Sequence, residues 1–92
     1  MKMEVSIMIY HHIINHIKLR QKDPVMVAVL CQKINEKRAT PNEKKAIQHL
    51  FQTIYNQLRD VDKQHAELTL VARNSEELLE WFLIQSYYHH VL

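Results

Sequence analysis

The chain has 92 residues, of which 47% are apolar and 24% are charged, and its formal net charge is +2. It contains a single cysteine, Cys31, and no glycine. One cysteine excludes an intramolecular disulfide and a zinc site built from several thiolates. The absence of glycine excludes a glycine-rich phosphate-binding loop and leaves few tight turns. These limits favour a single domain over residues 1–92, made of helices joined to helices.

Positive and negative charges are distributed unevenly between the two halves of the chain. Residues 1–45 carry nine Lys or Arg and four Asp or Glu, a net charge of +5. Residues 46–92 carry three and six, a net charge of −3. Such a separation of charge can orient a partner or a second copy of the chain.

The N-terminal segment shows neither a secretory signal nor a membrane span. Its apolar run is interrupted by His11 and His12 before it reaches signal-peptide length, and no small-residue cleavage site follows. No stretch approaches the roughly 18 uncharged apolar residues of a spanning helix. We therefore expect a cytoplasmic protein with no membrane partner, in keeping with its cysteine content.

Three capping signals divide the chain into four predicted helices. Asp23 is an N-cap residue followed by a proline at the first helical position. Thr40 is an N-cap residue with Glu43 three positions later, which is the pattern of a capping box. Asn74 or Ser75 caps the last helix, whose acidic first turn suits the helix dipole. The helices are expected near residues 3–20, 24–38, 41–72 and 75–91, with no β-sheet.

The third predicted helix carries a long heptad seam, with apolar residues in alternating steps of four and three. A helix over residues 41–72 would be about 48 Å long. Its weak point is residues 59–62, where two aspartates and a β-branched residue lower the helix propensity; a break there would give five shorter helices. Because the seam keeps its phase, we expect a continuous helix. The seam consists of Ile47, Phe51, Ile54, Leu58, Val61, His65, Leu68 and Ala72.

The first and fourth predicted helices are apolar around almost their whole circumference, which indicates burial on every side. A small monomer has room to surround one such helix, and the excess of apolar surface marks an interface. Large aromatic residues contribute most to such surfaces. The alternative is an ordinary core whose rim carries tyrosine hydroxyls and histidines. The predicted interface residues are Trp81, Phe82, Tyr87, Tyr88, Ile9 and Ile13.

Two histidines raise the question of a metal site. His12 and His16 are four residues apart and would share one helix face. A third ligand would have to come from His89, His90 or Cys31. No glutamate lies between the two histidines as in the zinc-protease motif. We therefore expect surface or interface histidines and no metal.

Residues 59–65 resemble the motif of the HEPN ribonuclease family, in which an arginine and a polar residue precede a histidine in an all-α domain. The resemblance covers these seven residues and implies RNA cleavage by Arg59 and His65 at a dimer interface. In a continuous helix the two side chains would face different directions, and His65 would occupy a core position of the seam. The ribonuclease interpretation therefore requires a helix break near Asp60.

A basic cluster surrounds the connection between the second and third predicted helices and could hold phosphates. Two helices with a short turn are also similar to a helix-turn-helix, in which only Asn42 would be suited to reading bases. The alternative is a solvated face whose lysines complement a helix dipole. The cluster consists of Lys33, Lys37, Arg38, Lys44 and Lys45.

Together these patterns predict a small all-α bundle around a long third helix. The second helix would run antiparallel to the first half of the third, and the fourth to its second half. We expect a non-enzymatic protein that binds another protein and also forms a homodimer, with no cofactor and no small-molecule substrate. In size and style it is similar to compact all-α adaptors, inhibitors and bacteriocin immunity proteins of phages and bacterial conflict systems. A nucleic-acid-binding regulator is the alternative.

Overall fold

The computed structural model describes residues 2–88, the first five of them through their backbone alone. This part of the chain forms five helices and no strand, which confirms the all-α prediction and corrects the predicted number of four helices. The last three residues of the helix predicted over 75–91 lie outside the described residues. The helices are α1 (Lys2–Leu19), α2 (Pro24–Asn35), α3 (Pro41–Arg59), α4 (Asp62–Leu68) and α5 (Ser75–Tyr88).

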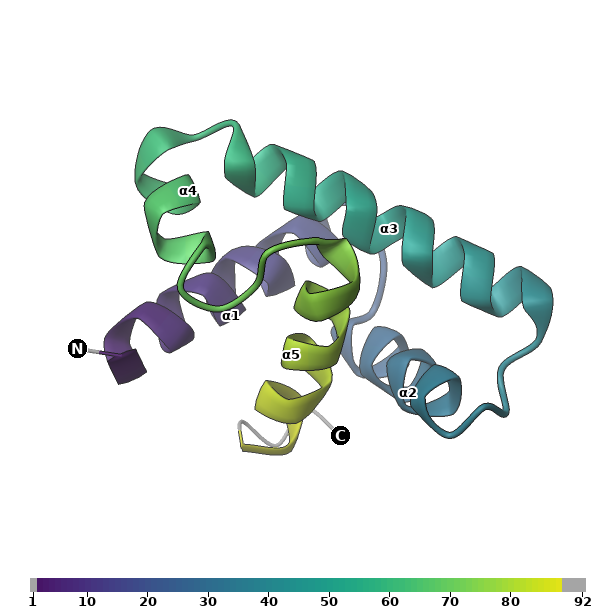
Figure 1. Cartoon of the computed structure of the whole chain (residues 1–92). Coiled ribbons are helices and arrows are strands. Elements are labelled where there is room, and N and C mark those ends of the chain that lie inside the picture. Colours follow the sequence, from purple (N-terminus) through teal and green to yellow (C-terminus); the bar gives the residue numbers. More distant parts are fainter. Residues whose placement is uncertain (1, 89–92) are drawn as a thin grey trace.

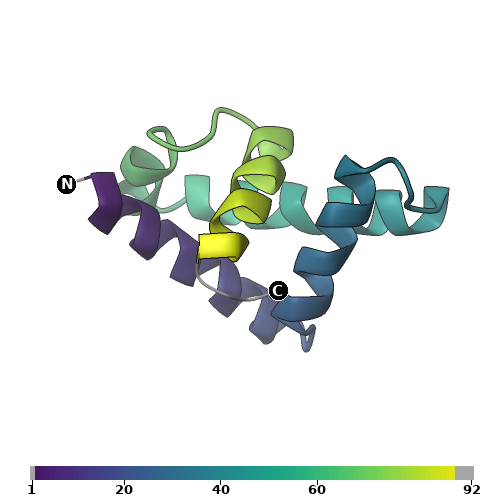
Figure 2. The same cartoon turned by 90° about the horizontal axis from the view of Figure 1, so that it is seen from below.

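Helix α3 spans the molecule, and the other helices pack along it (Figure 1). Helices α2 and α5 both contact α3 and each other. Figures 1 and 2 show that α2 and α5 cross α3, whereas the sequence predicted that they would lie antiparallel to it. Helix α4 turns back from the end of α3 and contacts α1. The crossing of α5 over α3 determines which residues of these helices line the site described below.

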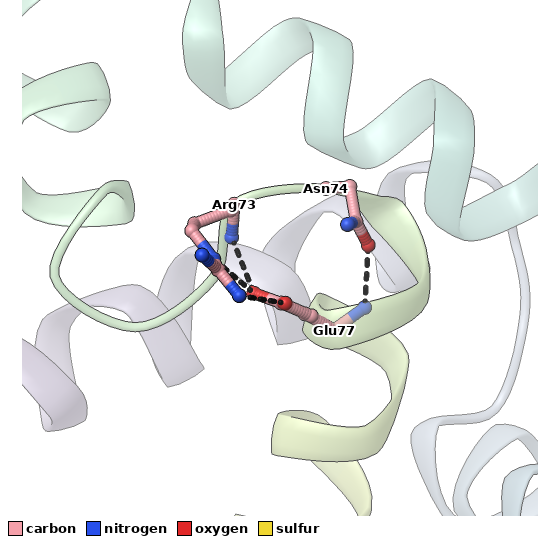
Figure 3. Close-up of polar contacts among 3 residues, drawn as sticks. All are labelled: Arg73, Asn74 and Glu77. Atoms are coloured by element: carbon pink, nitrogen blue, oxygen red, sulfur yellow. Dashed lines mark hydrogen bonds and ion pairs between the residues drawn. The ribbon is translucent and has the colours of Figure 1, made fainter.

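The capping signals in the sequence begin α2, α3 and α5 as predicted. The backbone N–H of Val25 donates to Asp23 Oδ1 at 2.9 Å. Both hydrogen bonds of the capping box between Thr40 and Glu43 are formed. At the start of α5 the backbone N–H of Glu77 donates to Asn74 Oδ1 at 2.9 Å, so Asn74 is the cap (Figure 3). These bonds satisfy backbone donors that a helix start leaves unpaired.

The long third helix is interrupted at Val61, so the prediction of a continuous helix over residues 41–72 is wrong. Val61 has extended φ and ψ angles of −105° and 117°. The first four seam residues are buried, whereas Val61 is 47% exposed and His65 is exposed. The two aspartates that flank Val61 favour a helix end over a helix interior. The break lets α4 fold back so that Leu68 is fully buried.

The chain has no glycine, and its described part makes two left-handed turns with other residues. Gln21 and Lys37 have φ angles of 57° and 59°. Beside them, the backbone N–H of Lys22 donates to the carbonyl of Ile17 at 3.1 Å, and that of Arg38 donates to Lys33 at 2.8 Å. Both arrangements are Schellman motifs, which normally use glycine at this position. The second one ends α2 at Asn35, three residues earlier than the sequence predicted.

Side chains from all five helices form one hydrophobic core. Cys31 is fully buried among them, as its place on the apolar face of α2 predicted. Among the described helices, none combines the length and apolar character that a membrane crossing requires. The buried apolar residues are Ile9, Tyr10, Ile13, Ile17, Val27, Ala28, Cys31, Ile47, Leu50, Phe51, Ile54, Leu58, Leu68, Ala72, Leu78, Leu79, Phe82 and Leu83.

Candidate protein-binding surface

Three of the six predicted interface residues belong to the core of the chain itself. Ile9, Ile13 and Phe82 are completely buried. The Phe82 ring lies 5.6 Å from the Tyr10 ring and 5.4 Å from the Phe51 ring, measured between centroids. These side chains have no surface left for a partner. Their assignment to an interface is therefore corrected, because α5 packs against α3 and α2, and α1 packs against α4, α2 and α3, more completely than the sequence suggested.

The other three predicted residues lie at or near the surface of α5. Tyr87 is 53% exposed, Tyr88 is 74% exposed, and Trp81 is half-buried at the edge of the core. Ile84, which the sequence analysis did not single out, is 54% exposed. Residues three and four apart share a helix face, so Ile84 lies beside Tyr87 and Tyr88. These three residues form an exposed apolar patch on the last turns of α5.

A groove of about 490 Å³ lies between α2, α3 and α5. Gln48 and Gln52 contribute to it from α3, and Ile34 and Asn35 from the end of α2. Four residues of α5 follow each other in steps of four, three and four and therefore share one helix face. They are Glu76, Glu80, Leu83 and Tyr87. The α5 wall of the groove therefore leads directly to the exposed Tyr87. Its other lining residues are Ser75 and Leu79.

Two glutamates of the groove differ from the neighbouring Glu77 because no other described residue pairs with their carboxylates. Glu77 accepts hydrogen bonds from the guanidinium and then the backbone N–H of Arg73, which hold its pKa below the ordinary 4.5 (Figure 3). Within the described residues, Glu76 and Glu80 have no such hydrogen bond or ion pair and are exposed. The groove-facing carboxylates are thus free to pair with a cation from outside.

A second, smaller pocket of about 180 Å³ adjoins the groove at Ile34, which lines both. Lys37 and Lys44 line it together with Ala39. Lys44 is one helical turn before Gln48 on α3, so the two pockets follow the same face of that helix. Neither lysine forms a salt bridge within the described residues. Free carboxylates therefore lie in one pocket and free ammonium groups in the adjoining one.

The predicted basic cluster is less available to phosphate than the sequence suggested. Lys33 forms a salt bridge of 3.6 Å with Glu43, and Arg38 pairs with Glu36. Hydrogen bonds from Gln32 and Arg38 hold the pKa of Glu36 below its ordinary value, and those from Thr40 do the same for Glu43. Lys37, Lys44 and Lys45 are exposed. The cluster therefore presents three free cations instead of five.

Neither the cysteine nor the histidines assemble a reactive centre within the described residues. Burial raises the pKa of Cys31 to about 12, so its thiol stays protonated. His12 lies 3.5 Å from Gln64 of α4, measured from Nδ1 to Nε2, and His16 is half-buried nearby on α1. The described residues contain no group of three or more His, Cys, Asp or Glu placed to hold a metal. The candidate ligands His89 and His90 lie outside the described residues.

The helix break separates the two residues of the HEPN-like motif onto α3 and α4. The guanidinium of Arg59 lies over the Tyr55 ring, 6.0 Å from its centroid. His65 is exposed on α4 and does not belong to the core, so its predicted packing role in the seam is wrong. The break at Asp60 is the condition that the ribonuclease interpretation requires.

Sequence reasoning missed the groove, although one signal for it was present. Lys44, Gln48 and Gln52 recur in steps of four residues and mark a polar stripe on α3. In the sequence alone, such a stripe indicates a solvated helix face, because the position at which α5 crosses α3 has no signal there. Asn35 and Glu76 enter the site only because α2 ends early and α5 crosses α3 beside it.

Comparison of the chain with models of protein families, with curated proteins and with solved structures gives no significant match. The site therefore has to be interpreted from its own geometry and charge.

Proposed function

We propose that this chain is a non-enzymatic protein that binds another protein through α5 and the groove beside it. The observation that supports this function is the continuity of the α5 wall from the free carboxylates of the groove to the exposed Tyr87. A surface with an apolar centre and a polar rim is typical of protein interfaces. Tyrosine is also enriched among the residues that contribute most to binding energy.

The lining of the groove favours a protein over a small molecule. Small-molecule pockets are lined predominantly by apolar and aromatic side chains. Of the described residues that line the groove, Ile34, Leu79 and Leu83 are apolar, the others are polar and none is aromatic. Polar side chains around a narrow apolar floor suit a macromolecular partner that brings its own hydrogen-bonding groups.

Capture of the partner with matched surface variants tests this function. Tyr87→Ala and Glu80→Lys change the proposed surface, whereas Leu70→Ala removes a side chain that is 71% exposed and lies between α4 and α5 in sequence. We expect one protein to be captured by the wild type and by Leu70→Ala and to be lost from the other two variants. Circular dichroism shows that each variant is folded. Equal capture by all four proteins would contradict the proposal.

Self-association is part of the same proposal, because Ile84, Tyr87 and Tyr88 expose apolar surface that a second copy would cover. Sedimentation velocity measures it directly. We expect a concentration-dependent dimer for the wild type and a weaker one for Tyr88→Ala. If the wild type is a monomer at all concentrations, this surface does not mediate self-association, and its proposed partner is a different protein.

The nucleic-acid alternative depends on the three free cations of the basic cluster. Titration of generic duplex and single-stranded DNA at low and moderate salt tests it, because contacts to phosphates weaken steeply with salt. Salt-dependent binding that Lys44→Gln and Lys45→Gln reduce would favour this alternative over protein binding.

The ribonuclease alternative depends on the break after Asp60, which places Arg59 on α3 and His65 on α4. RNA cleavage by the wild type that is lost in His65→Ala would favour it. The absence of cleavage by both proteins would leave protein binding as the better proposal.

A further inference from the structure

The groove and the basic pocket lie along the same face of α3, and together they make the surface named here the path. From Lys44 to Gln52 the path follows about 12 Å of helix axis, at 1.5 Å per residue. Ile34 belongs to both pockets, and Leu79 and Leu83 complete an apolar floor. The path is therefore as long as about two turns of a helix laid into it.

The two parts of this path carry opposite charges. The described residues that line the groove include Glu76 and Glu80 and no cation. Those that line the smaller pocket include Lys37 and Lys44 and no carboxylate. All four charged groups are exposed, and none has a hydrogen bond or salt bridge within the described part of the chain. An occupant with the opposite order of charges would satisfy both ends at once.

The backbone conformation of the occupant follows from what the site offers. Addition of a strand requires an exposed sheet edge, and the described residues form no strand. Polyproline segments dock into grooves lined by aromatic rings, and none of the described residues that line this groove is aromatic. An amphipathic helix requires an apolar floor with polar rims, and this is the arrangement that Ile34, Leu79 and Leu83 make with the amides of α3.

We propose that this path receives an amphipathic helix of a partner protein, with its basic end beside Glu76 and Glu80 and its acidic end beside Lys37 and Lys44. The proposal rests on the protein-binding function above and adds the chemistry of the partner. Apolar side chains of the helix would lie on Leu79 and Leu83. Gln48 and Gln52 would accept or donate hydrogen bonds along its polar edge.

Two synthetic helical peptides of about four turns test the charge order. Both carry the same leucine face and the same numbers of arginine and glutamate residues. One has arginines at one end and glutamates at the other, and the other peptide has them alternating along its length. We expect the charge-separated peptide to bind about tenfold more tightly at low salt, because several exposed ion pairs add small increments. Backbone amide shifts should be largest at Ile34, Leu79 and Leu83.

A matched pair of variants links the preference to the basic pocket. Lys44→Glu reverses a charge in the path, and Lys63→Glu makes the same change on α4. We expect Lys44→Glu to abolish the preference for the charge-separated peptide and Lys63→Glu to retain it. Equal binding of both peptides in the groove would overturn the charge order and leave the docking surface in place. Binding of neither peptide, or shifts confined to other helices, would overturn the inference, while partner capture tests the proposed function separately.

Discussion

The ring of Tyr10 on α1 stacks on the ring of Phe82 on α5, with centroids 5.6 Å apart and planes inclined by 18°. Burial raises the pKa of Tyr10. On α5 the Ser86 hydroxyl donates to the carbonyl of Phe82 at 2.8 Å. The first and last described helices therefore contact each other in the core. The aromatic residues at this contact have a structural role, whereas Tyr87 and Tyr88 are exposed.

Truncation of the two kinds of aromatic residue should therefore affect stability to very different extents. We expect Phe82→Ala to lower the free energy of unfolding by about 3–5 kcal/mol, because it leaves a cavity beside the rings of Tyr10 and Phe51. Tyr87→Ala should change it by no more than about 0.5 kcal/mol, because the side chain is mostly solvated. Urea denaturation followed by circular dichroism measures both values. Similar losses for the two variants would contradict the separation into core and surface.

Residue Val61 is the point at which the third predicted helix divides, and it begins α4 without the usual cap. Among the described residues, no side chain accepts a hydrogen bond from the first turn of α4. Threonine has the shape of valine and supplies a capping oxygen. We expect Val61→Thr to raise the free energy of unfolding by about 1 kcal/mol, measured by urea denaturation.

The matched control for this variant is Val25→Thr, which places the same change at a 43% exposed position inside the first turn of α2. No stabilisation is expected there, since Asp23 already caps that helix. Equal gains at both positions would show that the effect comes from replacing exposed valine and not from capping α4.

The helix starts could be predicted from the sequence because they depend on contacts between residues close in the chain. Thr40 and Glu43 form their capping box within four residues, and Asn74 reaches Glu77 in the same way. The two aspartates beside Val61 mark a weak point in the sequence, but the burial of Leu68 against distant helices, which overrides the phase of the heptad seam, has no local signal. The groove could not be predicted for the same reason: Ile34 and Glu76 meet across separate helices, and neither has a local signal for the other.

The two left-handed turns should be weak points because residues other than glycine occupy them. Gln21 has a φ angle of 57°, at which a side chain approaches the backbone closely. Gln21→Gly removes that contact and should raise the free energy of unfolding by about 1 kcal/mol. Thermal unfolding compares it with Lys45→Gly, which places glycine in the interior of α3 and should lower stability by a similar amount. Destabilisation by both glycines would indicate that the Gln21 turn carries no strain.

Stability should depend on pH through His16. Burial, followed by the charges of Arg20 and His12, lowers the pKa of His16 below its ordinary value of 6.5. Its buried Nδ1 has no hydrogen-bond partner within the described residues. The unfolded chain therefore binds a proton more readily than the folded one. The contribution of neutral His16 is complete above pH 6.5 and is lost as the pH falls from there toward the lower pKa of the folded state.

Urea denaturation at about pH 7.5 and pH 5 tests this dependence, with His16→Gln as the variant that cannot titrate. The wild type should lose more stability between the two conditions than the variant does. The pKa values of Glu36, Glu43 and Glu77 are held below 4.5, so their contributions are lost only at lower pH and do not obscure the comparison. An identical loss in both proteins would mean that the folded chain accommodates a charged His16 as well as water does. It would then exclude the burial of His16 as a source of the pH dependence.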